Sequence, residues 1–187
     1  MQTSLLIPNE RATTTKWVSD AAHSELAFKV KHLMIANVKG AFRTFTAEID
    51  GEDFTDSPVT VTIDASSVDT NDDVRDNHLK GADFFDVVNH SEIRFTGTTF
   101  KKTTGDNYKF TGQLMIKGVS HPVTLDVEFG GINKDPWGNE KAAFSLSGKI
   151  SRKEWGLHWN TALETGGMLL GDEVQIMADV QFIKQSK

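Results

Sequence analysis

Apolar and polar residues alternate with a period of two from about residue 17 to the C-terminus. Successive side chains of a β-strand point to opposite faces, so this period predicts strands with one buried face and one face in water. Alternation of this kind is typical of antiparallel sheets. The clearest apolar sets are Leu26/Phe28/Val30, Val59/Val61/Ile63, Phe110/Gly112/Leu114/Ile116, Val123/Leu125/Val127/Phe129, Phe144/Leu146/Gly148/Ile150 and Val174/Ile176/Ala178/Val180/Phe182.

Clusters of turn-forming residues separate these runs at intervals of roughly ten residues. They lie at 51–53, 104–107, 118–122 and 135–139. Strands at this spacing fit a sandwich or a barrel, and we favour the barrel because closure leaves no unpaired sheet edge. The pattern therefore predicts an all-β fold, an extended antiparallel up-and-down β-barrel of about eight to ten strands, lipocalin-like in architecture.

One segment departs from the alternation and predicts a short helix. Residues 69–73 are rich in helix N-cap residues, and their carboxylates suit the positive end of a helix. Gly81 stands where a glycine ends many helices. We expect one helix near residues 71–80, followed by an apolar hook, Phe84-Phe85 and then Val87-Val88, that packs into the core.

The N-terminal segment is polar and differs from the rest of the chain. Its only apolar run, Leu5-Leu6-Ile7, is broken by Pro8, whereas a secretory signal needs an apolar region of about 7–15 residues. We expect residues 1–15 to form a disordered polar leader and residues 16–187 to form a single domain. The lack of a signal predicts a cytoplasmic protein, and no run is long enough for a transmembrane segment.

Composition and charge exclude several classes of protein. The chain of 187 residues has a net charge of −6, which argues against nucleic-acid binding, and no cysteine for disulfides or thiolate metal sites. Twelve Phe against one Tyr provide apolar area without polar atoms. Residues 26–47 hold four basic and no acidic residues, whereas residues 48–86 hold twelve acidic and two basic ones. This asymmetry indicates either solvated strand faces of opposite sign or a barrel mouth that tolerates anions.

The residue types that carry chemistry show no familiar arrangement. The six histidines form no local pair of metal ligands. Residues 69–73 resemble the start of a calcium loop, but Val74 and Lys80 replace the glycine and glutamate that such a loop requires. The sequence also lacks a nucleophile elbow, a phosphate-binding loop and a dinucleotide fingerprint. We therefore expect no metal, no cofactor and no enzymatic activity.

Small residues at strand positions leave two interpretations open. They provide room for a ligand inside the barrel, or they mark bends and tight corners of the sheet. The positions concerned are Gly40, Ala47, Ala65, Gly112, Ala142, Gly148 and Ala178.

Several motifs in register are similar to those of one family. They are Trp17–Ser24, Phe28-x-Val30-x-His32, Gly40-x-Phe42, Asp76-Asn77-His78-Leu79-Lys80, Asp83-Phe84-Phe85-Asp86, Ile93-x-Phe95, Gly112-x-Leu114-x-Ile116-x-Gly118-Val119 and Leu170-Gly171-Asp172-x-Val174. On these motifs the chain resembles the YceI-like family, the bacterial lipocalin-like polyisoprenoid-binding proteins. The resemblance implies a barrel of about eight strands with a flanking helix, a long hydrophobic tunnel for an isoprenoid lipid, a quinone-like tail or an acyl chain, and a homodimer. Many relatives are exported to the periplasm.

We expect the protein to bind, store or transport such a lipid without catalysis. His32 follows the inward register of its strand, where it either selects a head group or is a core histidine bonded to backbone. Trp155, His158 and Trp159 are candidates for a second rim. The resemblance adds the motif positions His78, Leu79, Phe84 and Phe85. The predicted tunnel and mouth residues are Leu26, Phe28, Val30, His32, Phe42, Val61, Ile63, Phe110, Gly112, Leu114, Leu125, Val127, Phe144, Leu146, Ile176, Ala178 and Val180.

Two alternatives stay open at this point. One is an enzyme of isoprenoid or quinone metabolism that uses His78 with Asp76 or Asp83. The other is a stress-related scaffold protein with a solid barrel. The expected partner is a hydrophobic lipid, with transient membrane contact through the basic residues 26–47 as a weaker expectation.

Overall fold

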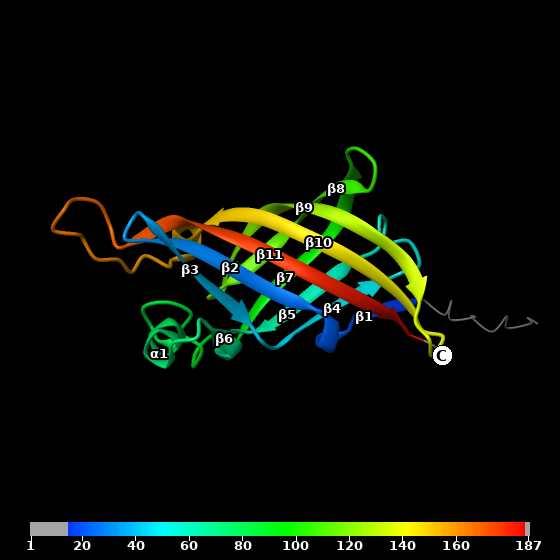
Figure 1. Cartoon of the computed structure of the whole chain (residues 1–187), viewed down its shortest axis with the longest axis horizontal. Helices are drawn as coiled ribbons and strands as arrows, with labels where there is room; N and C mark the ends of the chain where they lie inside the picture. The colour runs from blue at the N-terminus through cyan, green and yellow to red at the C-terminus, as the bar shows by residue number, and fades with distance from the viewer. Residues whose placement is uncertain (1–14, 186–187) are drawn as a thin grey trace, which may run out of the picture.

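The computed structural model describes residues 15–185, and most of them lie in one antiparallel sheet (Figure 1). The predicted leader, residues 1–15, lies outside the described residues except for Thr15. The strands are β1 (Lys16–Ser19), β2 (Glu25–His32), β3 (Ala36–Phe42), β4 (Phe45–Asp50), β5 (Val59–Asp64), β6 (Val68–Asp69), β7 (Glu92–Lys102), β8 (Asn107–Ile116), β9 (Val119–Lys134), β10 (Glu140–Ser151) and β11 (Leu170–Lys184). The helices are α1 (Asp73–Lys80) and three 3₁₀ turns, η1 (Ala21–His23), η2 (Ala65–Ser67) and η3 (Arg152–Trp155).

Eight strands close into a barrel in the order β1-β4-β5-β7-β8-β9-β10-β11, because β1 pairs with both β4 and β11. Trp17 of β1 lies opposite Ile49 on one side and Lys184 on the other. Strands β2, β3 and β6 continue the sheet from β11. The predicted all-β antiparallel barrel with one short helix is confirmed.

The period of two in the sequence places the apolar residues inside the barrel. In β8 and β9, for example, every second residue is buried, and Phe110 lies directly across from Leu125. Cross-strand apolar pairs of this kind stabilise a sheet and fix its register. The inner faces of the barrel strands thus form a continuous apolar surface.

Glycines on these inner faces make room for rings from the neighbouring strand. Gly97 and Gly112 are paired across β7 and β8, and the Phe110 ring covers Gly97 while the Phe95 ring covers Gly112. A Cβ added to Gly112 would lie 2.5 Å from the Phe95 ring. Gly40 is covered by Phe28 in the same way. At these positions the small residue accommodates a neighbouring side chain rather than a ligand.

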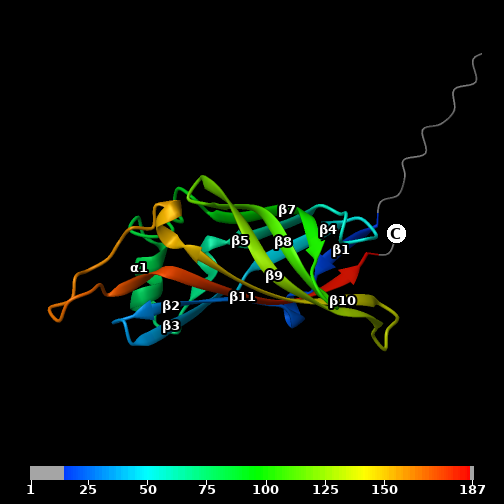
Figure 2. The same ribbon diagram turned by 90° about the horizontal axis from the view of Figure 1, so that it is seen from above.

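The two ends of the barrel differ (Figure 2). Helix α1, the β2–β3 turn and the long connection between η3 and β11 lie at one end, and β1 and the end of β11 lie at the other. Helix α1 begins two residues later than predicted, because Asp72 is its N-cap and accepts a hydrogen bond from the Arg75 backbone N at 3.0 Å.

A polar anchor fastens η1 to the outside of the barrel. Asp20 accepts hydrogen bonds from the Ala22 backbone N at 3.1 Å, the His23 ring at 2.8 Å and Lys141 Nζ at 3.0 Å. Burial alone would raise the pKa of Asp20, but the bonds from His23, Lys141 and Ala22 together hold that pKa below its usual value. The folded state therefore favours the ionised carboxylate.

Candidate functional site

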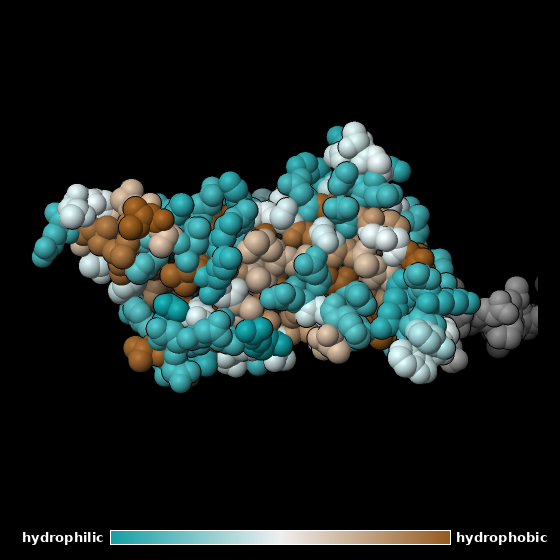
Figure 3. All heavy atoms as spheres, viewed as in Figure 1, coloured by the Kyte–Doolittle hydropathy of each residue, from teal (hydrophilic) through white to brown (hydrophobic). Residues whose placement is uncertain are grey.

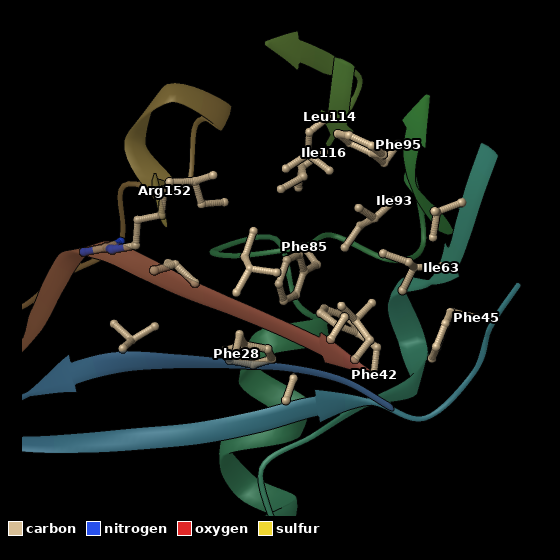
Figure 4. A pocket seen from close by; sticks show the side chains of 18 of the residues that line it. Phe28, Phe42, Phe45, Ile63, Phe85, Ile93, Phe95, Leu114, Ile116 and Arg152 are labelled. Carbon is tan, nitrogen blue, oxygen red and sulfur yellow. The ribbon is translucent and has the colours of Figure 1, made fainter. Parts of the chain in front are cut away.

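A cavity of about 680 Å³ runs through the inside of the barrel. This volume lies within the range of about 300–1,000 Å³ of small-molecule sites. Side chains of the sheet converge on it from several directions, with Phe28 and Phe42 on one side and Phe95, Leu114 and Ile116 facing them (Figure 4). The barrel is therefore hollow, which is the opposite of the solid interior that a pure scaffold would have.

The predicted tunnel positions line this cavity with one exception. Those that do so are Leu26, Phe28, Val30 and His32 of β2, Phe42 of β3, Val61 and Ile63 of β5, Phe110 and Leu114 of β8, Leu125 and Val127 of β9, Phe144 and Leu146 of β10, Ile176, Ala178 and Val180 of β11, and His78, Leu79, Phe84 and Phe85 around α1. Gly112 does not line it, because the Phe95 ring covers its inner face. That these residues bind a ligand stays a prediction.

The cavity is long and narrow. Its lining residues on β11 extend from Leu170 to Phe182. A strand rises about 3.3 Å per residue, and barrel strands are tilted by roughly 35–45°. The lined length along the barrel axis is thus about 30 Å, which matches an extended lipid tail rather than a compact ligand.

An aromatic cluster closes the end of the barrel away from α1. Phe54, in the loop between β4 and β5, contacts the rings of Phe100, Tyr108, Phe129 and Phe144 at centroid distances of 4.8–5.4 Å. Aromatic pairs in such tilted and edge-on arrangements are favourable beyond their buried area. We call this group the Phe54 plug. Phe100 and Phe144 of the plug also line the cavity, so the plug lies at this end of the tunnel.

The other end of the cavity is open and polar. Val74 of α1 lines the cavity and is also 82% exposed, so the cavity reaches the surface beside this helix. The polar side chains of the lining gather around this opening, which we call the mouth. They are His32, Thr70, Asp72, Arg75, His78 and Arg152.

A buried carboxylate holds α1 against the mouth. Asp76 accepts hydrogen bonds from the Thr70 backbone N at 2.8 Å and the Thr70 hydroxyl at 2.6 Å. Arg75 also donates to Thr70, through Nε to the Thr70 hydroxyl at 2.7 Å and through Nη2 to the Thr70 carbonyl at 2.9 Å. Buried polar groups need such partners, so the motif residue Asp76 positions the helix.

His78 joins α1 to the segment that precedes β11. Its Nε2 lies 2.9 Å from Asp83 Oδ2, and its ring packs edge-on against Phe84 and Trp159 at 5.1 and 4.7 Å. Within the described residues, Asp83 is the one side chain that is hydrogen-bonded to the His78 ring. The pair supports the wall of the mouth.

Arg152 fastens the same segment from the other side. Its Nε donates to the Gly171 carbonyl at 2.9 Å, and its Nη1 donates to the carbonyls of Leu157 and Trp159. Burial lowers the pKa of this guanidinium, and Asp172, whose Oδ1 lies 3.7 Å from Nη2, opposes that effect. The stem of Arg152 lines the cavity, while its head group is directed to the backbone around the mouth (Figure 4).

The remaining predicted rim residues have different positions. His32 is partly buried at the mouth, and no hydrogen bond of its ring is recorded within residues 15–185, so the interpretation as a bonded core histidine is not supported. Trp159 lines the mouth, whereas His158 is exposed and does not. Trp155 belongs to the core, where its Nε1 donates to the Leu114 carbonyl at 2.9 Å.

Among residues 15–185, no group of three His, Asp or Glu side chains is placed to hold a metal ion. None of the helices in that part of the chain has the length and apolar character required to span a bilayer.

Comparison with known proteins identifies the family. The model of the YceI-like domain matches residues 17–182. A UPF0312 protein of Staphylococcus epidermidis is 42% identical over 171 residues, which cover 90% of this chain and 97% of that protein. The chain belongs to the YceI-like family.

Solved structures agree with this assignment. The YCEI protein of Campylobacter jejuni is 37% identical and superposes with a TM-score of 0.72 over 83% of this chain and 90% of that one. A polyisoprenoid binding domain from Saccharophagus degradans superposes with a TM-score of 0.66 over 92% of this chain and 100% of that one. Its identity of 15% shows a common fold alone.

Two of the YceI-like motifs noted in the sequence, Asp76–Lys80 and Asp83–Asp86, lie at the mouth, whereas Trp17–Ser24 includes β1 at the other end of the barrel. Val88, which was predicted to pack into the core after the second motif, is 91% exposed. Asp76, His78 and Asp83 hold α1 and the following loop in place, and Phe84 and Phe85 form part of the lining. Sequence reasoning missed Phe54 and Arg152. Phe54 lies in a loop without periodicity, and Arg152 follows an alternating strand as an ordinary polar residue, so neither carries a local signal.

Proposed function

We propose that this YceI-like protein binds a long-chain isoprenoid lipid, polyprenyl or quinone-type, and stores or transports it without catalysis. The observation that carries the proposal is the long apolar tunnel inside the barrel, whose polar lining side chains lie at one mouth. The polyisoprenoid binding that is named for the Saccharophagus degradans domain supports the same class of ligand.

Burial of the tail supplies the affinity. Transfer of each CH₂ from water to an apolar site is favourable by about 0.8 kcal/mol, so a five-carbon isoprene unit contributes roughly 4 kcal/mol before the loss of its conformational freedom. An apolar wall needs no specific polar contact to gain this energy. The tail extends from the mouth to the Phe54 plug, and its head group lies beside His32, Arg75 and His78.

Ala178 offers a direct test, because it lines the tunnel midway along β11. An Ala178→Trp variant fills the tunnel from within. The adjacent Met177 does not line the cavity and serves as the site of a matched control, Met177→Trp. Native mass spectrometry after incubation with a polyprenyl lipid or a long-tail quinone measures the bound fraction.

We expect the wild type and Met177→Trp to bind one lipid each and Ala178→Trp to bind at least tenfold more weakly, since a displaced stretch of a few CH₂ groups is worth more than 1.4 kcal/mol. Equal binding by all three folded proteins would refute the tunnel as the site.

The catalytic alternative has its own test. If the His78–Asp83 pair were catalytic, His78→Ala would abolish turnover of the bound lipid while leaving it bound. We expect no turnover in either protein, since the pair supports the mouth. The cytoplasmic location and the homodimer stay predictions.

A further inference from the structure

An exposed apolar group projects from the mouth end of the molecule. It consists of Leu33, Met34 and Ile35 in the β2–β3 turn, which are 43%, 62% and 84% exposed, and Met168, which is 44% exposed. The two segments touch, because the Leu33 backbone N donates to the Leu169 carbonyl at 2.8 Å and Met34 packs on Gly167. We call these four residues the apolar tip. Figure 3 shows a brown, hydrophobic surface at this end of the molecule, on the left of the view.

The backbone of the tip is unfavourable for the residues it carries. Leu33 and Met34 have φ of 53° and 62°, in the left-handed region. Tight hairpin turns in this region favour Asn-Gly, because bulky side chains are strained there. Nothing in the described chain buries Met34 or Ile35 in return. A strained turn whose apolar side chains stay exposed does not stabilise the fold, and this indicates that the turn has a function in binding.

The tip is continuous with the lining of the tunnel. His32 precedes Leu33, and Leu169 follows Met168, and both flanking residues line the cavity. An apolar path therefore leads from the protruding turn into the mouth. A ligand tail following this path would stay in contact with apolar side chains.

The surface next to the tip is positive. Lys29, Lys31 and Lys39 lie on the outer side of the β2–β3 hairpin, and Lys29 is paired directly with Lys39. Within residues 15–185 none of the three forms an ion pair, although most other basic residues of the barrel do. Residues 26–47 contain no carboxylate, and the loop that carries Met168 contains one, Glu164. The β2–β3 hairpin thus keeps a basic face beside the apolar tip, while α1 at the same end of the barrel carries Asp72 and Asp73.

We propose that the apolar tip inserts into an anionic phospholipid bilayer, with the three lysines on the lipid phosphates and the mouth facing the membrane. Apolar insertion together with attraction to anionic head groups is the combination by which proteins bind a membrane surface. The proposal rests on the proposed function, since it supplies the path by which the lipid enters and leaves the tunnel. A second copy of this chain or another protein would cover the tip without requiring anionic lipid.

Vesicle flotation of the full chain tests the proposal. The vesicles contain phosphatidylcholine alone, or phosphatidylcholine with phosphatidylglycerol at about 3:1. The variants are Met34→Ser/Ile35→Ser and Lys29→Gln/Lys31→Gln/Lys39→Gln. Their matched controls at the far end of the barrel are Ile132→Ser/Trp137→Ser, which also removes two exposed apolar side chains, and Lys101→Gln/Lys102→Gln/Lys134→Gln, which removes three exposed positive charges.

The wild type and both controls should float with the anionic vesicles and much less with the neutral ones. Each lysine near an anionic surface strengthens binding roughly fivefold, so the lysine variant should lose on the order of a hundredfold. The apolar variant should lose about tenfold or more. Salt raised from about 0.05 to about 0.5 M should release the wild type. Thermal unfolding verifies that each variant is folded, and Ile35→Ser alone replaces the double variant if it is not.

Three results would overturn the proposal. The first is that the tip variants float as well as their controls do. The second is that the wild type binds neutral vesicles as well as anionic ones. The third is that the wild type forms a dimer which the Met34→Ser/Ile35→Ser change dissociates. Lipid uptake from detergent separates this proposal from the proposed function. If the tip variants take up lipid from detergent as the wild type does but no longer float, both the membrane proposal and the tunnel function are supported. If the wild type floats but takes up no lipid, only the tunnel function is refuted.

Discussion

The Phe54 plug gives the sharpest prediction about the length of the tunnel. A Phe54→Ala variant removes one ring that contacts four others at 4.8–5.4 Å. Phe→Ala at a fully buried site destabilises a protein by about 3–5 kcal/mol. Because Phe54 is only partly buried, we expect a loss of about 2–3 kcal/mol, which lowers the unfolding temperature by roughly 4–12 °C.

The same change should open the end of the tunnel at the plug. Phe100 and Phe144 belong to the plug and also line the cavity. Removal of the Phe54 ring, which contacts both, should therefore lengthen the tunnel. Competition between polyprenyl lipids of increasing length, read by native mass spectrometry, should show a preference shifted to longer tails. Trp137→Ala, which removes an exposed ring at the same end, is the control and should change neither quantity.

Two outcomes would refute this reasoning separately. A loss of stability below about 0.5 kcal/mol would mean that the ring contacts contribute little, as is usual for exposed sites. A large loss of stability with an unchanged length preference would mean that Phe54 packs the barrel end without limiting the ligand.

Asp76→Ala should destabilise the protein by about 1–3 kcal/mol in urea unfolding, because the Thr70 N–H and hydroxyl lose their buried acceptor; an unchanged midpoint would contradict this role. The pKa of Asp20 is lowered in the folded state, so its contribution to stability is present above the unfolded pKa of about 3.9 and is lost as the pH falls below it. Asp20→Asn should flatten the loss of stability below about pH 4, and an equally steep curve would count against the bonds that Asp20 accepts from His23 and Lys141. Gly112→Ala should lower stability by about 1–3 kcal/mol, because the added Cβ would lie 2.5 Å from both the Phe95 ring and the Thr96 carbonyl oxygen, measured as a lower unfolding temperature; a neutral effect would show that both neighbours move easily.

The sequence predicted the walls of the tunnel well, since burial on one face of a strand leaves a period of two. Residues such as Phe28, Ile63 and Val127 could be assigned to the interior because each belongs to an alternating set in one register. The helix was predictable for a similar reason, since Asp72 provides a cap with a local sequence signature.

Features that depend on contacts between segments distant in the sequence could not be predicted from the local sequence pattern. Gly112 has the inward register that was predicted, but a ring from the adjacent strand fills the space above it. Phe54 acquires its role only when four strands bring rings around its loop. Arg152 is a polar residue with three carbonyl partners, of which Leu157 and Trp159 lie in the irregular segment after η3 and Gly171 lies in β11. In each case the decisive neighbour is set by the tertiary structure.

The short strand β1 has a consequence for the order of assembly. It joins β4 to β11, and its partner Lys184 lies near the other end of the chain from Trp17. Pairing residues so far apart carries a high loop-closure entropy and slows folding. We therefore expect the curved sheet from β4 to β11 to form before the seam does, so that during synthesis the tunnel is an open trough until β11 has left the ribosome. A lipid present at that stage would meet the apolar wall from the side, before the mouth becomes its entrance.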